Sequence, residues 1–457
     1  MRYLVLGGGV AGTTVAENLH IFDQTAHVTL ISATETVKKV TNLEKKGEVI
    51  DSFEVIDSSP HHQCYHFICG LVTKCDFQLQ TVTLADGKTF QYDKLCIATG
   101  ARPNVIFPNI PHVVGIRDTE SVQDLQNRLK TCKHVTVVGN GGIASEFVFA
   151  AKHCQISWVI KDETITSVFV DSVASKFLLD SMKGENDSNC NPERVAVSKR
   201  QIYSTVIKQK NGPVLGSALG PDWYNGFSLD GTSSNKKLEI EYGCQIENVS
   251  TCSDDSDYNL KIELTNGQAL HSDVLVSATG VIPNSDLFKD QLNLSETDQG
   301  IIVDKRMRTS APNVYAAGDI CSIPWKECEN WKQMRLWTQA LQQGFYTACS
   351  MSASDDEVIE PDMSFEIFTH STKLFGYKVI MLGRYQEWEG CRCYFRISPG
   401  LEFVKLVVSN DRIQGALLIG ETDLEEVMEN LILNQTDISQ LGESILDPNI
   451  DIEDYFD

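Results

Sequence analysis

The sequence predicts an α/β fold made of two interleaved Rossmann-like domains and a small C-terminal α+β domain. A unit of strand, glycine-rich turn, helix and strand occurs at residues 3–31 and recurs at residues 134–160. Two buried strands further along, Leu95 to Gly100 and Val274 to Gly280, both end in Ala-Thr-Gly. Because repeated βαβ units form parallel sheets covered by helices, these repeats predict two such sheets.

The composition is that of a folded protein of two or three domains. The chain has 457 residues, of which 42% are hydrophobic and 22% charged. Its formal net charge of -23 argues against direct binding of nucleic acid or an anionic membrane. No stretch approaches the ~20 apolar residues of a membrane span. The first strand begins too early to leave room for a cleavable signal. We interpret the 14 scattered cysteines as reduced thiols of a cytosolic or nuclear protein.

The first unit contains a dinucleotide-binding turn. The strand Tyr3 to Leu6 opens directly onto Gly7-x-Gly9-x-x-Gly12 and a helical pattern. In such a turn the first glycine allows the tight bend, the second admits the pyrophosphate and the third lets the helix pack on the strand. Ser32 stands where an acidic residue usually closes the second strand, and its hydroxyl can still bind a ribose. The alternative is an ordinary glycine-rich turn.

The most specific signal is the segment from Thr309 to Asp319, which reads Thr-Ser-Ala-Pro-Asn-Val-Tyr-Ala-Ala-Gly-Asp. A buried strand ends there in Gly-Asp, beside the start of a helix. The carboxylate of Asp319 can accept a hydrogen bond from a ribityl hydroxyl of a flavin, and the helix N-terminus faces the pyrophosphate or the ring edge. The segment therefore predicts FAD as a cofactor.

The second glycine-rich turn, Gly139-x-Gly141-x-x-Ala144, is then left for a nicotinamide cofactor. Glu146 lies one turn into the following helix and is a candidate for a position near the nicotinamide. The alternative is a solvated first-turn acid that the helix dipole favours. Lys161 follows the second strand and can meet a 2′-phosphate or be an ordinary surface lysine, so the choice between NADH and NADPH stays open.

These motifs divide the chain. We assign residues 1–115 and 281–352 to an FAD-binding domain and residues 116–280 to an NAD(P)H-binding domain. A polar stretch at about residues 183–237 is an insertion in the latter, either a functional loop or a disordered one. Residues 353–457 form the C-terminal α+β domain, which ends in an acidic tail. That tail is either a solvated terminus or a docking peptide.

The residues assigned to cofactor binding come from both units, and none is assigned to a metal. They are Gly7, Gly9, Gly12, Ser32, Lys39, Val72, Thr99, Gly100, Gly139, Gly141, Gly142, Ala144, Glu146, Lys161, Gly280, Asp319 and Trp337.

The order of these elements resembles the pyridine nucleotide-disulfide oxidoreductase superfamily over roughly residues 1–350. The resemblance includes the helix from Trp337 to Ala348, which looks like the superfamily's helix under the flavin. It implies bound FAD and NAD(P)H as reductant. A closer resemblance to one member runs the whole length and includes the tail from Leu446 to Asp457. That resemblance implies a role in resisting oxidative stress, a nuclear and cytoplasmic location, and association with a tRNA-splicing RNA ligase.

The chain departs from the superfamily's disulfide reductases in its cysteines. Those enzymes carry C-x-x-x-x-C on the helix after the second strand, or C-x-x-C in the pyridine-nucleotide domain. Residues 33–63 contain no cysteine, and C-x-x-C occurs nowhere. Cys64 and Cys69 have the larger spacing but lie in a strand-like run, and Cys391 with Cys393 would form a strained disulfide. The last histidine is His370, so the reductases' C-terminal acid-base histidine is also missing.

The expected function is hydride transfer from NAD(P)H to FAD, followed by electron transfer to an unknown acceptor other than an internal disulfide. Two alternatives stay open. One is a redox-gated binding protein with negligible turnover. The other is a flavin disulfide reductase that uses an unrecognised cysteine pair.

Overall fold

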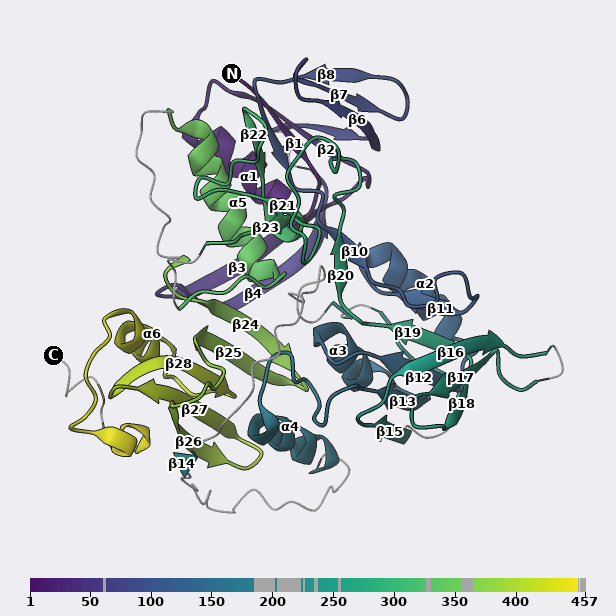
Figure 1. The fold of residues 1–457 in the computed structure, drawn as a ribbon, viewed down its shortest axis with the longest axis vertical. Helices are drawn as coiled ribbons and strands as arrows, with labels where there is room; N and C mark the ends of the chain where they lie inside the picture. Colours follow the sequence, from purple (N-terminus) through teal and green to yellow (C-terminus); the bar gives the residue numbers. More distant parts are fainter. Residues whose placement is uncertain are drawn as a thin grey trace.

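The structure is a computed structural model. It describes residues 1–60, 63–184, 202–203, 223–224, 227–233, 237–253, 256–325, 330–354, 365–450 and 452. Most of the predicted insertion and the end of the acidic tail lie outside the described residues. The predicted α/β class is confirmed, with two parallel sheets and an antiparallel C-terminal sheet (Figure 1).

The first domain is a five-stranded parallel sheet with order β22-β9-β1-β2-β5. Its strands are β1 (Arg2–Leu6), β2 (His27–Ser32), β5 (His66–Cys69), β9 (Lys94–Ile97) and β22 (Val314–Ala316). Helices α1 (Val10–Phe22) and α5 (Trp337–Ser352) pack against each other beside this sheet. A smaller antiparallel sheet contains β6 (Val72–Asp76), β7 (Thr81–Leu84) and β8 (Thr89–Gln91). Because parallel strands end at the same edge, this fold brings the first glycine turn close to the Gly-Asp segment.

The second domain repeats the arrangement with sheet order β11-β19-β12-β13-β15. Its strands are β11 (Val113–Gly115), β12 (His134–Val138), β13 (Gln155–Val159), β15 (Lys237–Glu241) and β19 (Val274–Ser277). Its helices are α2 (Thr119–Leu129), α3 (Gly142–Ala150) and α4 (Ser172–Gly184). An antiparallel sheet of β16 (Ile246–Thr251), β17 (Leu260–Leu264) and β18 (Ala269–Ser272) lies beside it.

Two short strands connect the domains. The chain leaves the first domain through β10 (Ala101–Pro103) and returns through β20 (Val281–Pro283), and these strands pair antiparallel. The chain therefore enters the second domain before residue 115, where we predicted the boundary. Strand β11 (Val113–Gly115) already pairs with β19 in the second sheet.

A long β-hairpin follows β2, where the disulfide reductases have a helix. It consists of β3 (Val37–Lys46) and β4 (Val49–Ser58) and reaches down to the C-terminal domain (Figure 1). At its turn, the Glu48 amide donates to Glu429 Oε1 at 2.9 Å. Gly47 has φ +65°, and a Cβ there would lie 2.1 Å from Glu429 Oε2. The hairpin thus fastens the first domain to the C-terminal one.

The C-terminal domain is a six-stranded antiparallel sheet of order β14-β26-β27-β28-β25-β24. Its own elements are β24 (Thr369–Leu374), β25 (Tyr377–Gly383), β26 (Arg392–Ser398), β27 (Glu402–Ser409), β28 (Arg412–Ile419) and α6 (Glu425–Leu433). The edge strand β14 (Ile202–Tyr203) comes from the insertion of the second domain. The insertion therefore joins the C-terminal sheet at that edge.

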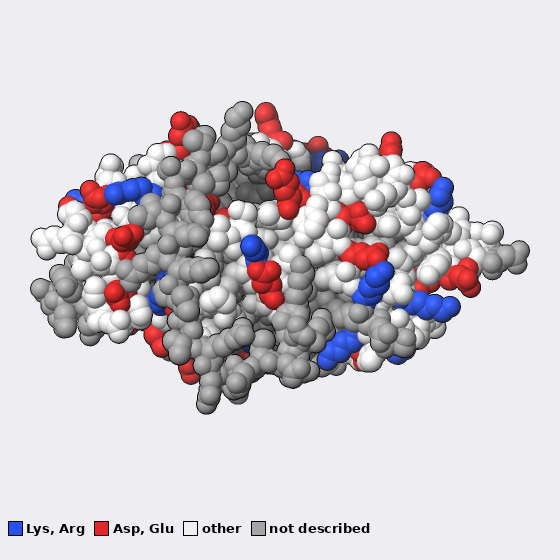
Figure 2. All heavy atoms as spheres, turned by 90° about the horizontal axis from the view of Figure 1, so that it is seen from below, with Lys and Arg blue, Asp and Glu red and all other residues white. Residues whose placement is uncertain are grey.

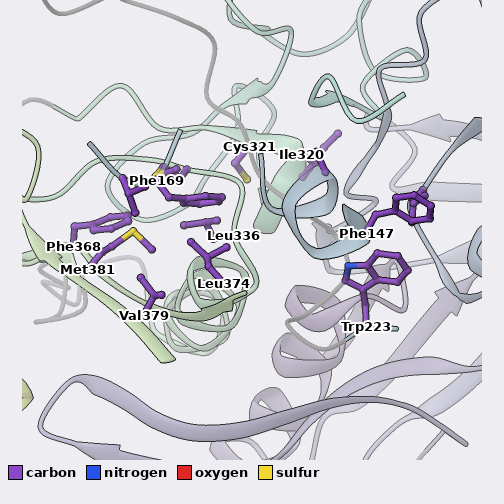
Figure 3. Packing of buried hydrophobic residues seen from close by; sticks show 14 of the residues in the cluster. Phe147, Phe169, Trp223, Ile320, Cys321, Leu336, Phe368, Leu374, Val379 and Met381 are labelled. Atoms are coloured by element: carbon purple, nitrogen blue, oxygen red, sulfur yellow. The ribbon is translucent and has the colours of Figure 1, made fainter. Parts of the chain in front are cut away.

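One hydrophobic core spans all three domains. Figure 3 shows Phe169 of the second domain near Phe368 and Met381 of the C-terminal domain and Leu336 beside α5, and the four residues share one cluster. Trp223, at the end of the insertion motif, packs in the same cluster near Phe147 of α3. The three domains are thus in direct contact through this cluster.

The surface is acidic overall, but its charges are mixed. On the face in Figure 2, acidic and basic side chains of the described residues are interspersed among uncharged ones. No helix within the described ranges combines the length and apolar character that crossing a membrane requires.

Candidate cofactor sites

The first glycine turn is shaped by close backbone contacts. Gly7 has φ +117°, and a Cβ there would lie 2.1 Å from the Ala98 carbonyl oxygen. A Cβ on Gly12 would lie 1.9 Å from the Gly7 oxygen, whereas a Cβ on Gly9 would meet nothing within 4 Å. The turn is therefore closed on the protein side and open at Gly9, at the N-terminus of α1, where a pyrophosphate can bind.

The other predicted residues of this unit lie in different places, and Ser32 is the one that contacts the turn, because a Cβ on Gly8 would lie 2.6 Å from its Oγ. Ser32 is buried at the end of β2, and its hydroxyl accepts a hydrogen bond from the Thr34 amide at 3.3 Å. Val72 begins β6. The ammonium of Lys39 forms an ion pair with Glu17 of α1 at 3.2 Å, so the structure places it along the helix and not at its N-terminus.

The Gly-Asp turn is held in place by the side chains of Gln343 and Arg335. Gly318 has φ +80° and its amide donates to Gln343 Oε1 of α5 at 2.8 Å. Arg335 donates from Nε to the Asp319 carbonyl oxygen at 2.8 Å and forms a buried ion pair with Asp298 at 2.5 Å. These contacts fix the backbone from which the Asp319 side chain extends.

Arg117 is a site residue that sequence reasoning missed. Its guanidinium Nη1 lies 3.4 Å from Asp319 Oδ2, and its Nη2 would lie 2.8 Å from a Cβ on Gly100. Burial raises the pKa of Asp319, and the charges of Arg117 and Arg335 oppose that rise. The local pattern around Arg117 contains no signal for this role.

Two buried polar atoms show that the site fits a flavin nucleotide. Thr99 Oγ1 and Trp337 Nε1 have no hydrogen-bond partner among the described residues. Such atoms are rare in folded proteins and usually face a ligand or water. Trp337 also begins α5 without a side-chain cap, and the ring of Phe53 from the hairpin lies 4.0 Å from it. The open glycine turn, Asp319 and these donors together suit a phosphate, a ribityl chain and a ring.

Replacing Asp319 with alanine is expected to weaken FAD binding by roughly 10- to 150-fold. The substitution removes a charge-assisted hydrogen bond worth about 1.5–3 kcal/mol. It also leaves the buried Arg117 without its carboxylate partner. Flavin fluorescence after equilibrium dialysis measures the effect. Asp286→Ala is the control, because Asp286 is exposed and, among the described residues, forms its ion pair with Arg102. Full flavin retention in the Asp319 variant would contradict the assignment.

The second glycine turn opens on a cavity of about 380 Å³. Gly139 has φ +124°, and a Cβ there would lie 2.0 Å from the Ala278 oxygen, while a Cβ on Gly141 would meet nothing within 4 Å. The geometry therefore repeats that of the first turn. The predicted residues that line the cavity are Gly139, Gly141, Gly142, Lys161 and Gly280.

Two predicted residues of this unit lie behind the cavity wall. Ala144 is fully buried, where a small side chain lets α3 pack on the sheet. Glu146 is buried one turn further along α3 and does not line the cavity.

The loop after β13 is tied to the glycine turn by Asn140, which sequence reasoning also missed. Its Nδ2 donates to Asp162 Oδ2 at 3.0 Å, and Ser167 Oγ donates to the same oxygen at 2.7 Å. Lys161 next to it is exposed and lines the cavity. Asp162 Oδ2 is thus already hydrogen-bonded to Asn140 and Ser167. Lys161 instead lines the space where a ribose or its phosphate would bind.

No disulfide links the described cysteines in this structure. All twelve are free thiols, and Cys190 and Cys328 lie outside the described residues. Cys69 is the last residue of β5 and Cys64 precedes that strand; since an extended strand rises ~3.3 Å per residue, the two are too far apart for a disulfide. Cys391 and Cys393 are buried and not bonded to each other. No group of three potential metal ligands occurs among the described side chains.

The fold and its two glycine turns define a class of protein, the two-Rossmann oxidoreductases that bind a flavin and a pyridine nucleotide. The model of the family described as "Pyridine nucleotide-disulphide oxidoreductase" matches residues 1–212 and 229–344. The chain therefore belongs to this family, whose cofactors are FAD and NAD(P)H.

Similar proteins agree with this assignment. Pyridine nucleotide-disulfide oxidoreductase domain-containing protein 1 of Mus musculus is 40% identical, over 100% of this chain and 98% of that one. The protein of the same name from Drosophila melanogaster is also 40% identical, over 100% and 99%. Ferredoxin reductase for the CYP199A2 system from Rhodopseudomonas palustris has a TM-score of 0.71 at 19% identity, with 99% of each chain covered. The predicted resemblance is confirmed.

Proposed function

We propose that this protein is an FAD-dependent NAD(P)H oxidoreductase that works without a redox-active disulfide and acts slowly in oxidative-stress defence. The observation that carries the proposal is the β3–β4 hairpin. It stands where the disulfide reductases carry their cysteine helix, while both nucleotide turns keep their binding geometry. Reducing equivalents therefore pass to an acceptor outside this chain.

The residues of the site bind and orient. Arg117 and Asp319 hold the flavin nucleotide, the Gly141 turn holds the pyridine nucleotide, and Phe53 with Trp337 shields one side of the site from water. When bound, FAD supplies the hydride acceptor for NAD(P)H. The chain contributes position and charge. His370 is unsuited to acid-base catalysis near neutral pH, because burial and Lys332 lower its pKa to about 3.

The partner is proposed from resemblance. From the resemblance noted in the sequence we propose that the chain protects an oxidation-sensitive partner, the tRNA-splicing RNA ligase, in the cytoplasm and nucleus. The electron acceptor is unidentified. One similar structure is the covalent putidaredoxin reductase–putidaredoxin complex, at a TM-score of 0.66 and 18% identity, which makes a ferredoxin-type protein one candidate class.

A redox-gated binding protein with negligible turnover is the second candidate. It is favoured by the lack of a second redox centre among the described residues, where neither a disulfide nor a metal cluster occurs. Steady-state turnover with added acceptors separates the two, because a gate binds nucleotide yet reduces no acceptor.

Anaerobic titration of the flavoprotein with NADH or NADPH is expected to bleach the flavin absorbance at about one nucleotide per FAD. The cavity at Gly141 provides the binding site, and a comparison of the two nucleotides shows whether Lys161 prefers a 2′-phosphate. Admission of air then measures the rate of reoxidation, which we expect to be slow. Bleaching by dithionite but by neither nucleotide would contradict the proposal.

A further inference from the structure

The loop from β13 to α4 connects the two ends of the pyridine-nucleotide cavity. At one end, Lys161 and Asp162 lie after the second strand, where the adenosine ribose binds in such folds. At the other end, the ring of Phe169 lies 3.5 Å from the position of a Cβ on Gly142. Phe169 thus stands past the pyrophosphate turn, at the end where the nicotinamide would lie.

The C-terminal domain holds the end of this loop by a buried ion triad. Lys405 of β27 donates from Nζ to Asp171 Oδ2 and to Glu387 Oε1, both at 2.7 Å. Its side chain is only 1% exposed. Burial opposes the charged ammonium, but the two carboxylates outweigh it and raise the pKa of Lys405. The contact is therefore a charged link between two domains.

Asp171 also binds the helix that follows it. Its other oxygen, Oδ1, accepts hydrogen bonds from the amides of Val173 at 2.7 Å and Ala174 at 3.0 Å. It thereby caps the first turn of α4. The end of the loop is fixed both to its own helix and to Lys405, two residues after Phe169.

Phe169 itself contacts the C-terminal domain. Its ring stacks on His370 of β24 at 6.1 Å between centroids and 27° between planes. His370 is in turn held by Thr338 of α5, with 3.0 Å between Nδ1 and Oγ1. Figure 3 shows Phe169 directed toward Phe368 and Met381 of the same domain. The aromatic end of the cavity is thus packed against the C-terminal domain.

We propose that Lys405 is a positioning residue for the pyridine-nucleotide site. By holding Asp171 it fixes the end of the loop and keeps Phe169 against Gly142, so that the C-terminal domain sets the nicotinamide end of the cavity. The inference rests on the proposed reduction of the protein by NAD(P)H. It goes beyond that function by assigning the C-terminal domain a part in nucleotide binding.

The test uses three variants of the full-length flavoprotein. Asp171→Asn removes the charge that faces Lys405 but keeps Oδ1 as the helix cap, and Lys405 still has Glu387 as a buried partner. Lys405→Arg is the conservative variant, since a guanidinium can bind both carboxylates. Arg396→Met is the matched control, because it breaks a pair with Glu402, at 2.9 Å, that does not contact the loop.

Stopped-flow reduction by NADPH and by NADH separates positioning from stability. In Asp171→Asn we expect the nucleotide concentration for half-maximal reduction to rise on the order of tenfold. FAD content, dithionite reduction and the limiting rate are expected to stay unchanged. Lys405→Arg should retain most of the affinity, and Arg396→Met should lower only the thermal midpoint.

Three results would overturn the inference. They are an unchanged concentration dependence in Asp171→Asn, an equal shift in the Arg396 control, and loss of FAD from Asp171→Asn, which would make the triad a stability element. Failure of the proposed function has a different signature, because the unaltered protein would then be reduced by dithionite and by neither nucleotide.

Discussion

Replacing Gly141 with valine is expected to abolish reduction by NAD(P)H and to leave bound FAD in place. A Cβ at this position meets nothing within 4 Å, and the backbone φ of -98° is accessible to any L-residue. The variant should therefore fold normally. Its side chain would fill the space above the N-terminus of α3, where the backbone must approach the pyrophosphate. Rapid mixing with NADPH and NADH under anaerobic conditions measures the loss.

The first glycine turn provides the matched experiment. Gly9 also has open space at its Cβ position and a φ of -75°, so Gly9→Val should fold but fail to bind FAD. Gly7→Ala differs from both, because its Cβ would overlap the Ala98 oxygen, so it should lower the thermal midpoint. If Gly141→Val were reduced at the unaltered rate, the pyridine nucleotide would have to bind elsewhere.

The glycine turns could be predicted because their signal is local. A tight turn, a helix N-terminus and two strands lie within about thirty residues, and the backbone there depends on the glycines themselves. The Gly-Asp segment was predictable for the same reason. Arg117 could not be predicted in this way, because it meets Asp319 only after the chain has crossed between the domains at β10 and β20.

The hairpin was also missed, although the sequence contains a signal for it. Lys46-Gly47-Glu48 separates two runs with apolar residues at intervals, and this pattern favours a hairpin. The family resemblance concerned the cysteines that residues 33–63 lack, and it contained no prediction of the two strands that stand in place of the helix. The buried charge of Lys405 is a harder case. The sequence shows a lysine, Lys405, within an apolar strand, but its partner Asp171 lies 234 residues away.

The hairpin has a chemical consequence that can be measured. In a disulfide reductase the flavin passes electrons to a cysteine pair, so that the enzyme takes up four electrons per FAD. Here β3 and β4 occupy that position without a cysteine, and Phe53 of β4 lies against Trp337 at the start of α5. Two of the described thiols are unsuited to the role, since burial raises the pKa of Cys75 and of Cys132 to about 12. Thiols with such values are poor nucleophiles.

Stoichiometric anaerobic titration with dithionite is therefore expected to end at two electrons per FAD, with no change in the number of free thiols. Thiol counts on the denatured protein before and after reduction include every cysteine of the chain. The double variant Cys64→Ser, Cys69→Ser is the control and should titrate like the unaltered protein, because Cys69 ends the extended strand β5 and Cys64 precedes it. Uptake of four electrons with two new thiols would contradict the hypothesis and support a disulfide reductase. Uptake of two means that each reducing equivalent from NAD(P)H stays at the flavin until an external acceptor arrives, which suits slow protection of a partner better than rapid reduction.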